Sequence, residues 1–152
     1  MLLRGGTVQN YSPEPISADE LFSGLTPRQK KELASLTVRK QLLPKTSVFA
    51  SGEMPLRIYV HHSGRAILFD DNGLKNVIDA RPVESDWIYG IVEALLEKPL
   101  EISIETLSRC EFDVIDRDDF LRFIRDQPLL CFRLVERLCR MYQGALQEIR
   151  SY

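Results

Sequence analysis

The sequence predicts a mainly β protein with flanking helices: a jelly roll of about eight strands (a double-stranded β-helix), preceded by short helices and followed by a long one. Residues 38–116 are short segments rich in β-branched and aromatic residues, separated by glycines and prolines. Helix-capping signals precede this region, and apolar residues at helical spacing follow it. We expect a flexible tail at 1–16 and one domain at 17–152, with helices in 17–37, the β-roll in 38–116 and C-terminal helices in 117–152.

The composition is that of one globular domain. The chain has 152 residues, of which 44% are hydrophobic and 28% charged, which is enough to build a core. A net charge of −2 excludes a global attraction to nucleic acid or to an anionic membrane, and no apolar run approaches the length of a membrane span. The three cysteines, Cys110, Cys131 and Cys139, form no close pair, which predicts a reducing, cytoplasmic location.

Two short helices are expected before the roll. Glycines and prolines interrupt residues 1–16, so no regular element is expected there. Ser17, with a glutamate three residues later, has the pattern of a capping box. Thr26 and Pro27 form a second helix start, because proline is favoured at the first helical position. This second helix is expected to end near Leu36.

The strands of the roll are predicted from period-2 alternation and from turn residues. Asn72-Gly73 is a strong hairpin signal and predicts that the strands on either side of it pair. The expected strands lie within 38–44, 47–51, 57–62, 65–71, 75–81, 86–90, 102–108 and 110–116.

Two helices are expected after the roll. Asp116 can cap a short helix over 117–127, and Pro128 begins a longer helix that runs to about Tyr152. Apolar residues at alternating spacings of three and four predict that two copies of the long helix pair in a dimer. These residues are Val135, Leu138, Tyr142, Ala145, Ile149 and Tyr152. Alternatively, the helix packs only on its own roll, and a second apolar set can serve that packing: Leu130, Cys131, Phe132 and Leu134.

Specific residues in the roll resemble the cyclic nucleotide-binding domain, the sensor module of the catabolite activator family, of kinase regulatory subunits and of gated channels. That family shows an apolar pair, a glycine with an acid, an aromatic-apolar pair and a second glycine. The matching residues are Val48, Phe49, Gly52, Glu53, Tyr59, Val60 and Gly64, and Gly73 resembles the family's hairpin glycine. The resemblance covers about Ser17 to Tyr152 and implies the same order of helices, roll and helices.

The resemblance also implies a phosphate-binding cassette, in which a glutamate binds the ribose and an arginine pairs with the cyclic phosphate. Here Tyr89 and Gly90 take the aromatic-glycine place and Ser103 keeps the hydroxyl. Ile91 falls at the glutamate position and Leu100 at the arginine position. Glu93 can take the glutamate role only if the turn moves by two residues.

This degenerate cassette predicts weak or absent binding of cyclic AMP and cyclic GMP. A buried phosphate needs hydrogen-bond donors and a cation, and each charged hydrogen bond contributes roughly 1.5–3 kcal/mol. Three outcomes are open for the cavity. It is filled by core side chains (Leu95, Leu96, Leu100 and Trp87), it admits a less charged ligand, or it binds cyclic nucleotides weakly.

The sequence shows no sign of an enzyme or of a metal site. No serine or cysteine has a nucleophile setting, and His61 and His62, as neighbours on a strand, point to opposite faces and cannot chelate one metal. Asp70 to Gly73 resembles half a calcium loop, but the downstream glutamate is missing. We therefore expect no catalysis and no cofactor other than a weakly bound cyclic nucleotide.

The expected role is a regulatory module that forms a homodimer. In the activator family a helix-turn-helix domain follows the long helix; this chain stops at Tyr152, so we expect no direct DNA binding. The net charge and the lack of a long apolar run predict no membrane binding. A protein partner would dock on the long helix or on the basic face near Arg28. The alternative is a functional sensor of a cyclic nucleotide or another small anionic ligand, acting in signalling or transcription regulation and holding the anion with Gly90, Ile91, Ser103 and backbone amides.

Overall fold

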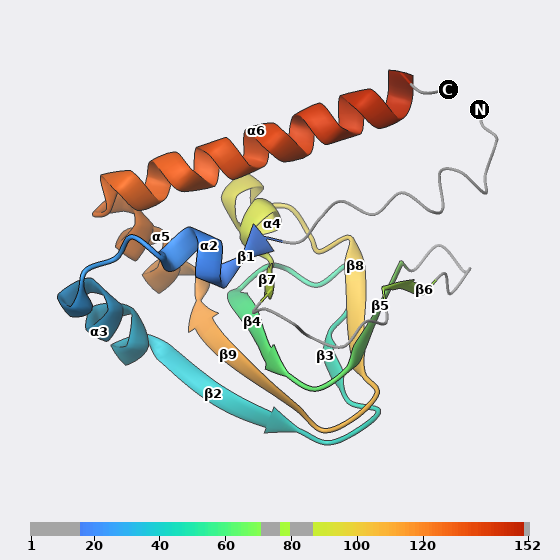
Figure 1. Cartoon of the computed structure of the whole chain (residues 1–152). Coiled ribbons are helices and arrows are strands. Elements are labelled where there is room, and N and C mark those ends of the chain that lie inside the picture. The colour runs from blue at the N-terminus through green and yellow to red at the C-terminus, as the bar shows by residue number, and fades with distance from the viewer. Residues whose placement is uncertain (1–15, 71–76, 80–86, 151–152) are drawn as a thin grey trace.

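The computed structural model describes residues 16–70, 77–79 and 87–150. Two antiparallel sheets form the roll (Figure 1): a five-stranded sheet in the order β1-β7-β4-β9-β2 and a four-stranded sheet in the order β3-β8-β5-β6. The strands are β1 (Ile16–Ser17), β2 (Thr37–Leu42), β3 (Ser47–Phe49), β4 (Arg57–Ser63), β5 (Ala66–Asp70), β6 (Val77–Asp79), β7 (Trp87–Tyr89), β8 (Ile102–Thr106) and β9 (Cys110–Asp116). The helices are α2 (Ala18–Phe22), α3 (Pro27–Ser35), α4 (Ile91–Leu96), α5 (Arg117–Arg125) and α6 (Pro128–Arg150).

The predicted fold class is confirmed. The eight expected strands correspond to β2–β9, and the structure adds the two-residue strand β1 at the edge of the larger sheet. Ile16, the last residue of the expected tail, belongs to β1 and pairs with Ile88. Residues 1–15 of that tail and the hairpin signal at 72–73 lie outside the described residues.

The helix starts follow the expected capping chemistry. Ser17 Oγ accepts a hydrogen bond from the Glu20 N–H at 3.3 Å. Thr26 Oγ1 accepts from the Gln29 N–H, and Gln29 Oε1 accepts from the Thr26 N–H at 2.8 Å, which completes a capping box. Asp116 is at the N-cap of α5, but its side chain makes no capping hydrogen bond.

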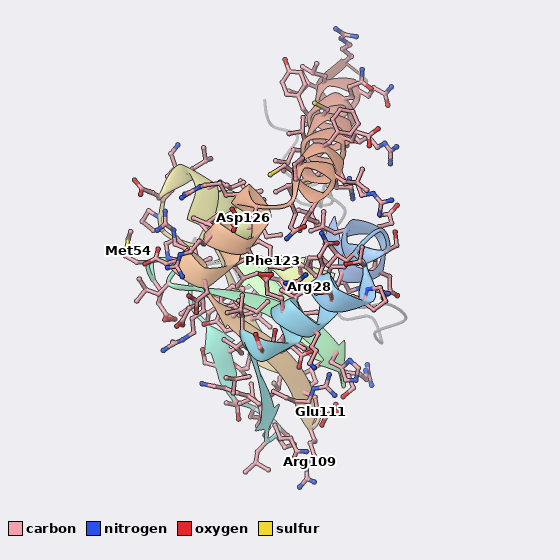
Figure 2. All side chains as sticks on the ribbon, turned by 90° about the vertical axis from the view of Figure 1, so that its left-hand side faces the viewer. Arg28, Met54, Arg109, Glu111, Phe123 and Asp126 are labelled. Atoms are coloured by element: carbon pink, nitrogen blue, oxygen red, sulfur yellow. The ribbon has the colours of Figure 1, made fainter. Side chains whose placement is uncertain are left out.

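Two separate cores stabilise the molecule. Alternate residues of β4, such as Ile58 and Val60, face the helices and pack with Phe120 of α5 in the first core. The second core lies between the two sheets and contains Phe49 and Phe112. In both views of the molecule α6 lies along one edge, beyond the roll (Figures 1 and 2). The cassette segment β7–α4–β8 contributes residues to both cores.

Buried polar contacts and one glycine fix the turns at the end of the roll far from α6. Thr106 is fully buried, and its hydroxyl donates to the Leu43 carbonyl at 2.7 Å and accepts from the Thr46 N–H at 2.8 Å. Gly64 has φ +91°, and a Cβ there would lie 2.3 Å from the Arg109 carbonyl oxygen. A side chain at this position is therefore excluded by both backbone conformation and space.

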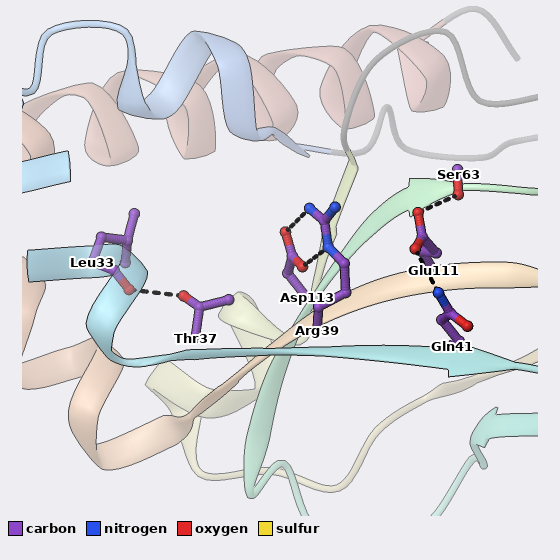
Figure 3. A network of polar contacts seen from close by, with 7 residues as sticks. All are labelled: Leu33, Thr37, Arg39, Gln41, Ser63, Glu111 and Asp113. Carbon is purple, nitrogen blue, oxygen red and sulfur yellow. Dashed lines mark hydrogen bonds and ion pairs between the residues drawn. The ribbon is translucent and has the colours of Figure 1, made fainter. Parts of the chain in front are cut away.

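The outer face of the five-stranded sheet carries a polar ladder (Figure 3). Arg39 of β2 donates through Nε and Nη2 to the two carboxylate oxygens of Asp113 at 2.7 and 3.0 Å. Gln41 and Ser63 both donate to Glu111, from the strands on either side of β9. These partly exposed pairs each contribute little stability, and they make polar the part of this face that lies beyond the apolar residues packed against the helices.

No helix in the described ranges has both the length and the apolar content to cross a membrane.

Candidate functional site

The cassette is a sharp turn between β7 and β8 that contains the short helix α4. Tyr89 ends β7, and Gly90 has φ +99°, a left-handed conformation that glycine adopts without strain. A Cβ at Gly90 would lie 3.1 Å from the Arg57 carbonyl oxygen, so the glycine also allows a close approach to β4. The helix ends at Glu97, which has φ +56° and donates its N–H to the Glu93 carbonyl. The expected site residues thus lie together along one turn.

Both positions at which the family has its charged anchors are packed into the cores. Leu100 is 4% exposed and lies between the sheets, in the same core as Tyr89 and Phe49. Ile91 is 2% exposed and belongs to the other core, against the helices. The aliphatic residues therefore add packing that a charged side chain at either position would disrupt.

The hydroxyl that the cassette retains is engaged within the protein. Ser103 is buried, and its Oγ accepts a hydrogen bond from the Ser51 N–H at 2.8 Å. Next to it, Gly52 N–H donates to the Leu100 carbonyl and Leu100 N–H donates to the Glu53 carbonyl, both at 2.8 Å. The loop between β3 and β4 is thereby attached to the cassette by three hydrogen bonds.

The ionisable residues around the turn are mainly acidic. Glu93 is partly buried on α4; this burial raises the pKa of its carboxyl above 4.5, the charge of Glu101 raises it further, and its own backbone N–H opposes both. Glu97 and Glu101 are exposed nearby, with Lys98 between them in the sequence. Such a charge distribution disfavours a bound anion.

The expectation that Leu95 and Leu96 fill the cassette cavity is wrong. Their side chains are 43% and 58% exposed. The helix turns Ile91 and Ala94 toward the core, because residues three apart share a face, and so the two leucines point outward. Leu100 does occupy the inner core, and Trp87 packs partly buried against it, as expected.

Arg117 is a site residue that the sequence analysis missed. Its Nε donates to the Ala94 carbonyl at 3.0 Å, and Nη2 donates to Glu97 at 3.1 Å, so the guanidinium caps the C-terminus of α4. Its Nη1 donates to Asp118, and its backbone N–H donates to the Leu56 carbonyl at 2.9 Å. A cation in the first turn of α5 is unfavourable, because the N-terminus of a helix carries partial positive charge. This unfavourable position was the one signal in the sequence that Arg117 binds groups outside α5.

The apolar residues of α6 fall into two stripes. Leu130 and Leu134 are buried as expected, Cys131 is partly buried, and Leu138 packs against the same core although it was expected at the dimer seam. Phe132, expected as a packing residue, is 59% exposed. The residues turned away from the core define an outer stripe at spacings of three and four: Phe132, Val135, Cys139, Tyr142, Leu146 and Ile149.

Within this stripe, three residues of the expected seam are clearly exposed: Val135 at 54%, Tyr142 at 65% and Ile149 at 66%. Ala145, another member of the expected seam, is partly buried. The exposed apolar face of α6 therefore differs from the expected one, because α2 and α5 cover the side of the helix that includes Leu138.

A cavity of about 450 Å³ lies away from the cassette. It is located between α2, α3 and the outer face of the five-stranded sheet, with Phe22, Leu33 and Val60 on its apolar walls and the Arg39–Asp113 pair at its edge. No group of three or more potential metal ligands occurs among the described residues.

The fold, with its cassette turn and long C-terminal helix, is that of cyclic nucleotide-binding domains. The catabolite activator protein of Thermus thermophilus superposes with a TM-score of 0.71 at 25% identity, over 86% of this chain and 62% of that one. The sensor domain of the transcriptional regulator DNR from Pseudomonas aeruginosa gives 0.68 at 17% identity, over 91% and 85% of the two chains. The regulatory domain of Toxoplasma gondii PKA, crystallised with cAMP, gives 0.61 at 14% identity, over 79% and 45%.

These neighbours are a catabolite activator protein, the sensor domain of a transcriptional regulator and the regulatory domain of a kinase, and this chain is similar to them in fold. No protein-family model matches the sequence, and no curated protein does. The chain spans less than two thirds of the Thermus protein and less than half of the Toxoplasma one.

Proposed function

We propose that this chain is a non-enzymatic regulatory module of the cyclic nucleotide-binding fold that binds cyclic AMP and cyclic GMP weakly or not at all. The observation that carries the proposal is the burial of Leu100 at 4% and Ile91 at 2% at the positions of the two polar anchors. A cyclic phosphate placed beside Leu100 would be desolvated without a cation, and the nearby Glu93 and Glu101 add charge of the same sign.

The missing charged anchors are expected to weaken the binding free energy of a cyclic nucleotide by several kcal/mol. Loss of one charge-assisted hydrogen bond removes roughly 1.5–3 kcal/mol, and desolvation of the phosphate against aliphatic groups adds to that. Since every 1.4 kcal/mol is about tenfold in affinity, the expected loss is about two to four decades. The Ser103 hydroxyl does not compensate, because the one hydrogen bond that it can donate, besides accepting from the Ser51 N–H, supplies no positive charge.

The test is calorimetric titration with cyclic AMP and cyclic GMP of the wild type, of Leu100→Arg and of Leu100→Met as the apolar control. We expect no heat from the wild type or from Leu100→Met. Micromolar binding by the wild type would refute the proposal. Binding by Leu100→Arg alone would show that the cavity is open and that only its cation was lost, whereas silence of all three would indicate a cavity closed by core side chains.

The alternative function is a working sensor of a cyclic nucleotide or another small anionic ligand. The observation that favours it is the preserved turn: Gly90 and Glu97 keep the left-handed conformations that shape α4. The Toxoplasma neighbour was crystallised with cAMP, which supports this reading for the fold in general. Micromolar binding in the same titration would favour this alternative.

We further propose that two copies of the chain pair in parallel through the outer stripe of α6. Apolar residues at alternating spacings of three and four form such seams, and in a parallel pair each seam residue lies beside its own counterpart. Cys139 lies in this stripe and is exposed, whereas Cys110 is buried and Cys131 partly so. The pairing therefore brings two Cys139 thiols close together.

Oxidative cross-linking tests this pairing. With copper–phenanthroline the wild type should form a covalent two-chain species under dilute conditions, Cys139→Ser should not, and Cys131→Ser should behave as the wild type does. The same result for Cys139→Ser and wild type, or a single-chain mass by light scattering before oxidation, would refute the pairing.

The domain limits 17–152, the cytoplasmic location and the absence of direct DNA contact remain predictions from the sequence.

A further inference from the structure

The outward side of the cassette carries an exposed apolar surface, which we call the cassette patch. It consists of Met54 and Leu56 from the loop between β3 and β4, exposed at 53% and 67%, and Leu95 and Leu96 from α4, exposed at 43% and 58%. Figure 2 shows Met54 beside α4 at the edge of the molecule. Single exposed leucines are ordinary, but four large apolar side chains on two adjoining segments indicate an interaction site.

Hydrogen bonds hold these two segments against each other. The carbonyl of Leu56 accepts from the Arg117 N–H at 2.9 Å, while the Arg117 guanidinium donates to the carbonyl of Ala94, the residue before Leu95. On the other side of Met54, the Glu53 carbonyl accepts from the Leu100 N–H at 2.8 Å. The patch is therefore preformed, and a partner would bind it without the cost of ordering a loop.

The surroundings of the patch are acidic. The segments that build it, 50–57, 91–101 and 116–119, hold seven acidic and three basic residues, although the whole chain has a net charge of only −2. One of the three cations, Arg117, is already bound to Glu97 and Asp118. Charge complementarity thus favours a partner with basic residues around its apolar ones and disfavours an anionic membrane or a nucleic acid.

We infer that the cassette patch is a docking surface for a protein segment that presents apolar side chains flanked by lysines or arginines. The four patch residues would be covered by the apolar side chains, and the basic residues would face the acidic rim. The inference rests on the proposed function, because a regulatory module acts by binding another protein. The docking surface requires neither nucleotide binding nor pairing of α6.

A synthetic peptide tests the chemistry of this surface. The probe is an 18-residue amphipathic helix of leucine and lysine, and the same peptide with glutamate in place of lysine is the charge control. We expect the leucine–lysine peptide to shift the amide NMR signals of Glu53, Met54, Leu56, Arg57 and residues 94–97, and the leucine–glutamate peptide to leave them unchanged. Shifts concentrated elsewhere, or equal binding of both peptides, would overturn the inference.

Matched variants make the test specific. The double variant Leu95→Asn, Leu96→Asn, and separately Leu56→Asn, should weaken binding of the leucine–lysine peptide about tenfold or more, because central apolar residues dominate such interfaces. The control Leu43→Asn, Leu107→Asn changes two leucines that are 64% and 40% exposed outside the patch and should alter the affinity less than about twofold. Circular dichroism confirms that each variant is folded. An unchanged affinity in both patch variants would overturn the inference.

Two further measurements exclude other occupants. Vesicles of phosphatidylcholine and phosphatidylserine should not co-sediment with the protein, and the Leu95, Leu96 variant should keep the wild-type mass in light scattering. If the wild type binds vesicles and the variant does not, the patch binds a membrane. If the variant has half the mass of the wild type, the patch binds a second copy of the chain. Either result would overturn the inference. Neither the nucleotide titration nor the Cys139 cross-link reports on the patch, so the proposed function and this inference fail separately.

Discussion

Tyr142→Glu is the sharpest test of the α6 seam, because it places a charge at the centre of the outer stripe. The Tyr142 side chain is 65% exposed in the single chain. A tyrosine buries about 150–250 Å² in a full contact, so pairing would cover roughly 130 Å² of it per chain. At about 25 cal/mol per Å² this is about 3 kcal/mol per chain, which corresponds to at least two decades in the dissociation constant.

Sedimentation velocity of the wild type, Tyr142→Glu and Gln147→Glu over a range of concentrations measures the effect. Gln147 is exposed and lies outside the outer stripe, so Gln147→Glu adds the same charge without touching the seam. We expect the wild type and Gln147→Glu to sediment as two chains and Tyr142→Glu as one. If Tyr142→Glu keeps the two-chain mass, the outer stripe is not the interface; if Gln147→Glu also dissociates, charge rather than the seam is responsible.

Three further predictions concern stability. Gly64→Ala should lower the free energy of unfolding in urea by several kcal/mol, whereas Gly52→Ala should lower it by only about 1–2 kcal/mol. Both glycines have positive φ, but of the two only Gly52 has free space for a Cβ. Equal losses would contradict the steric argument. Thr106→Val should cost about 1–3 kcal/mol because it removes the acceptor of the Thr46 N–H, and a neutral effect would mean that water replaces the hydroxyl. Glu93→Gln should raise Tm at pH 7 and should give no gain at a pH below 4.5. Burial raises the pKa of the Glu93 carboxyl in the folded state above its value in the unfolded chain. The wild type is therefore most stable below the unfolded-state pKa of Glu93 and loses stability as the pH rises through the folded-state pKa. A gain that grows as pH falls would reverse this sign and refute it.

The strands and helix starts were predictable because their signals are local. In β9 the apolar residues Phe112 and Val114 alternate with the polar residues Glu111 and Asp113, and the structure places the first pair in the inner core and the second on the outer face. Likewise the capping box at Thr26 needs only a partner three residues away. Signals of this range do not depend on how the rest of the chain folds.

The outer stripe of α6 was only partly predictable. Sequence spacing alone allows two apolar faces on this helix, and the sequence of the helix does not indicate which face packs against the rest of the domain. The contacts with α2 and α5 select the face with Leu130, Leu134 and Leu138, which leaves Phe132 outside. The choice between the faces is a tertiary effect, and so it required the structure.

The resemblance to the family located the cassette and its two missing charges, but not what replaces them. The resemblance implies that a glutamate and an arginine of the turn bind the ribose and the phosphate of a nucleotide. Here the protein's own groups make connections to the turn: Ser103 accepts from Ser51, Leu100 exchanges hydrogen bonds with Gly52 and Glu53, and Arg117 caps α4. These contacts link residues far apart in sequence, which is why no local pattern predicted them.

Because these connections are intramolecular, the turn has partners within the chain, and α4 lies against them with Leu95 and Leu96 facing outward. A nucleotide-dependent switch needs a cassette that is loosely held until the ligand arrives, since a ligand shifts an equilibrium only by its differential affinity for two states. Arg117 fastens α4 to α5 by one side chain, so Arg117→Ala should be the variant that restores mobility to the turn. The proposed cassette patch would then form without a nucleotide, since the contacts that hold α4 lie within the chain.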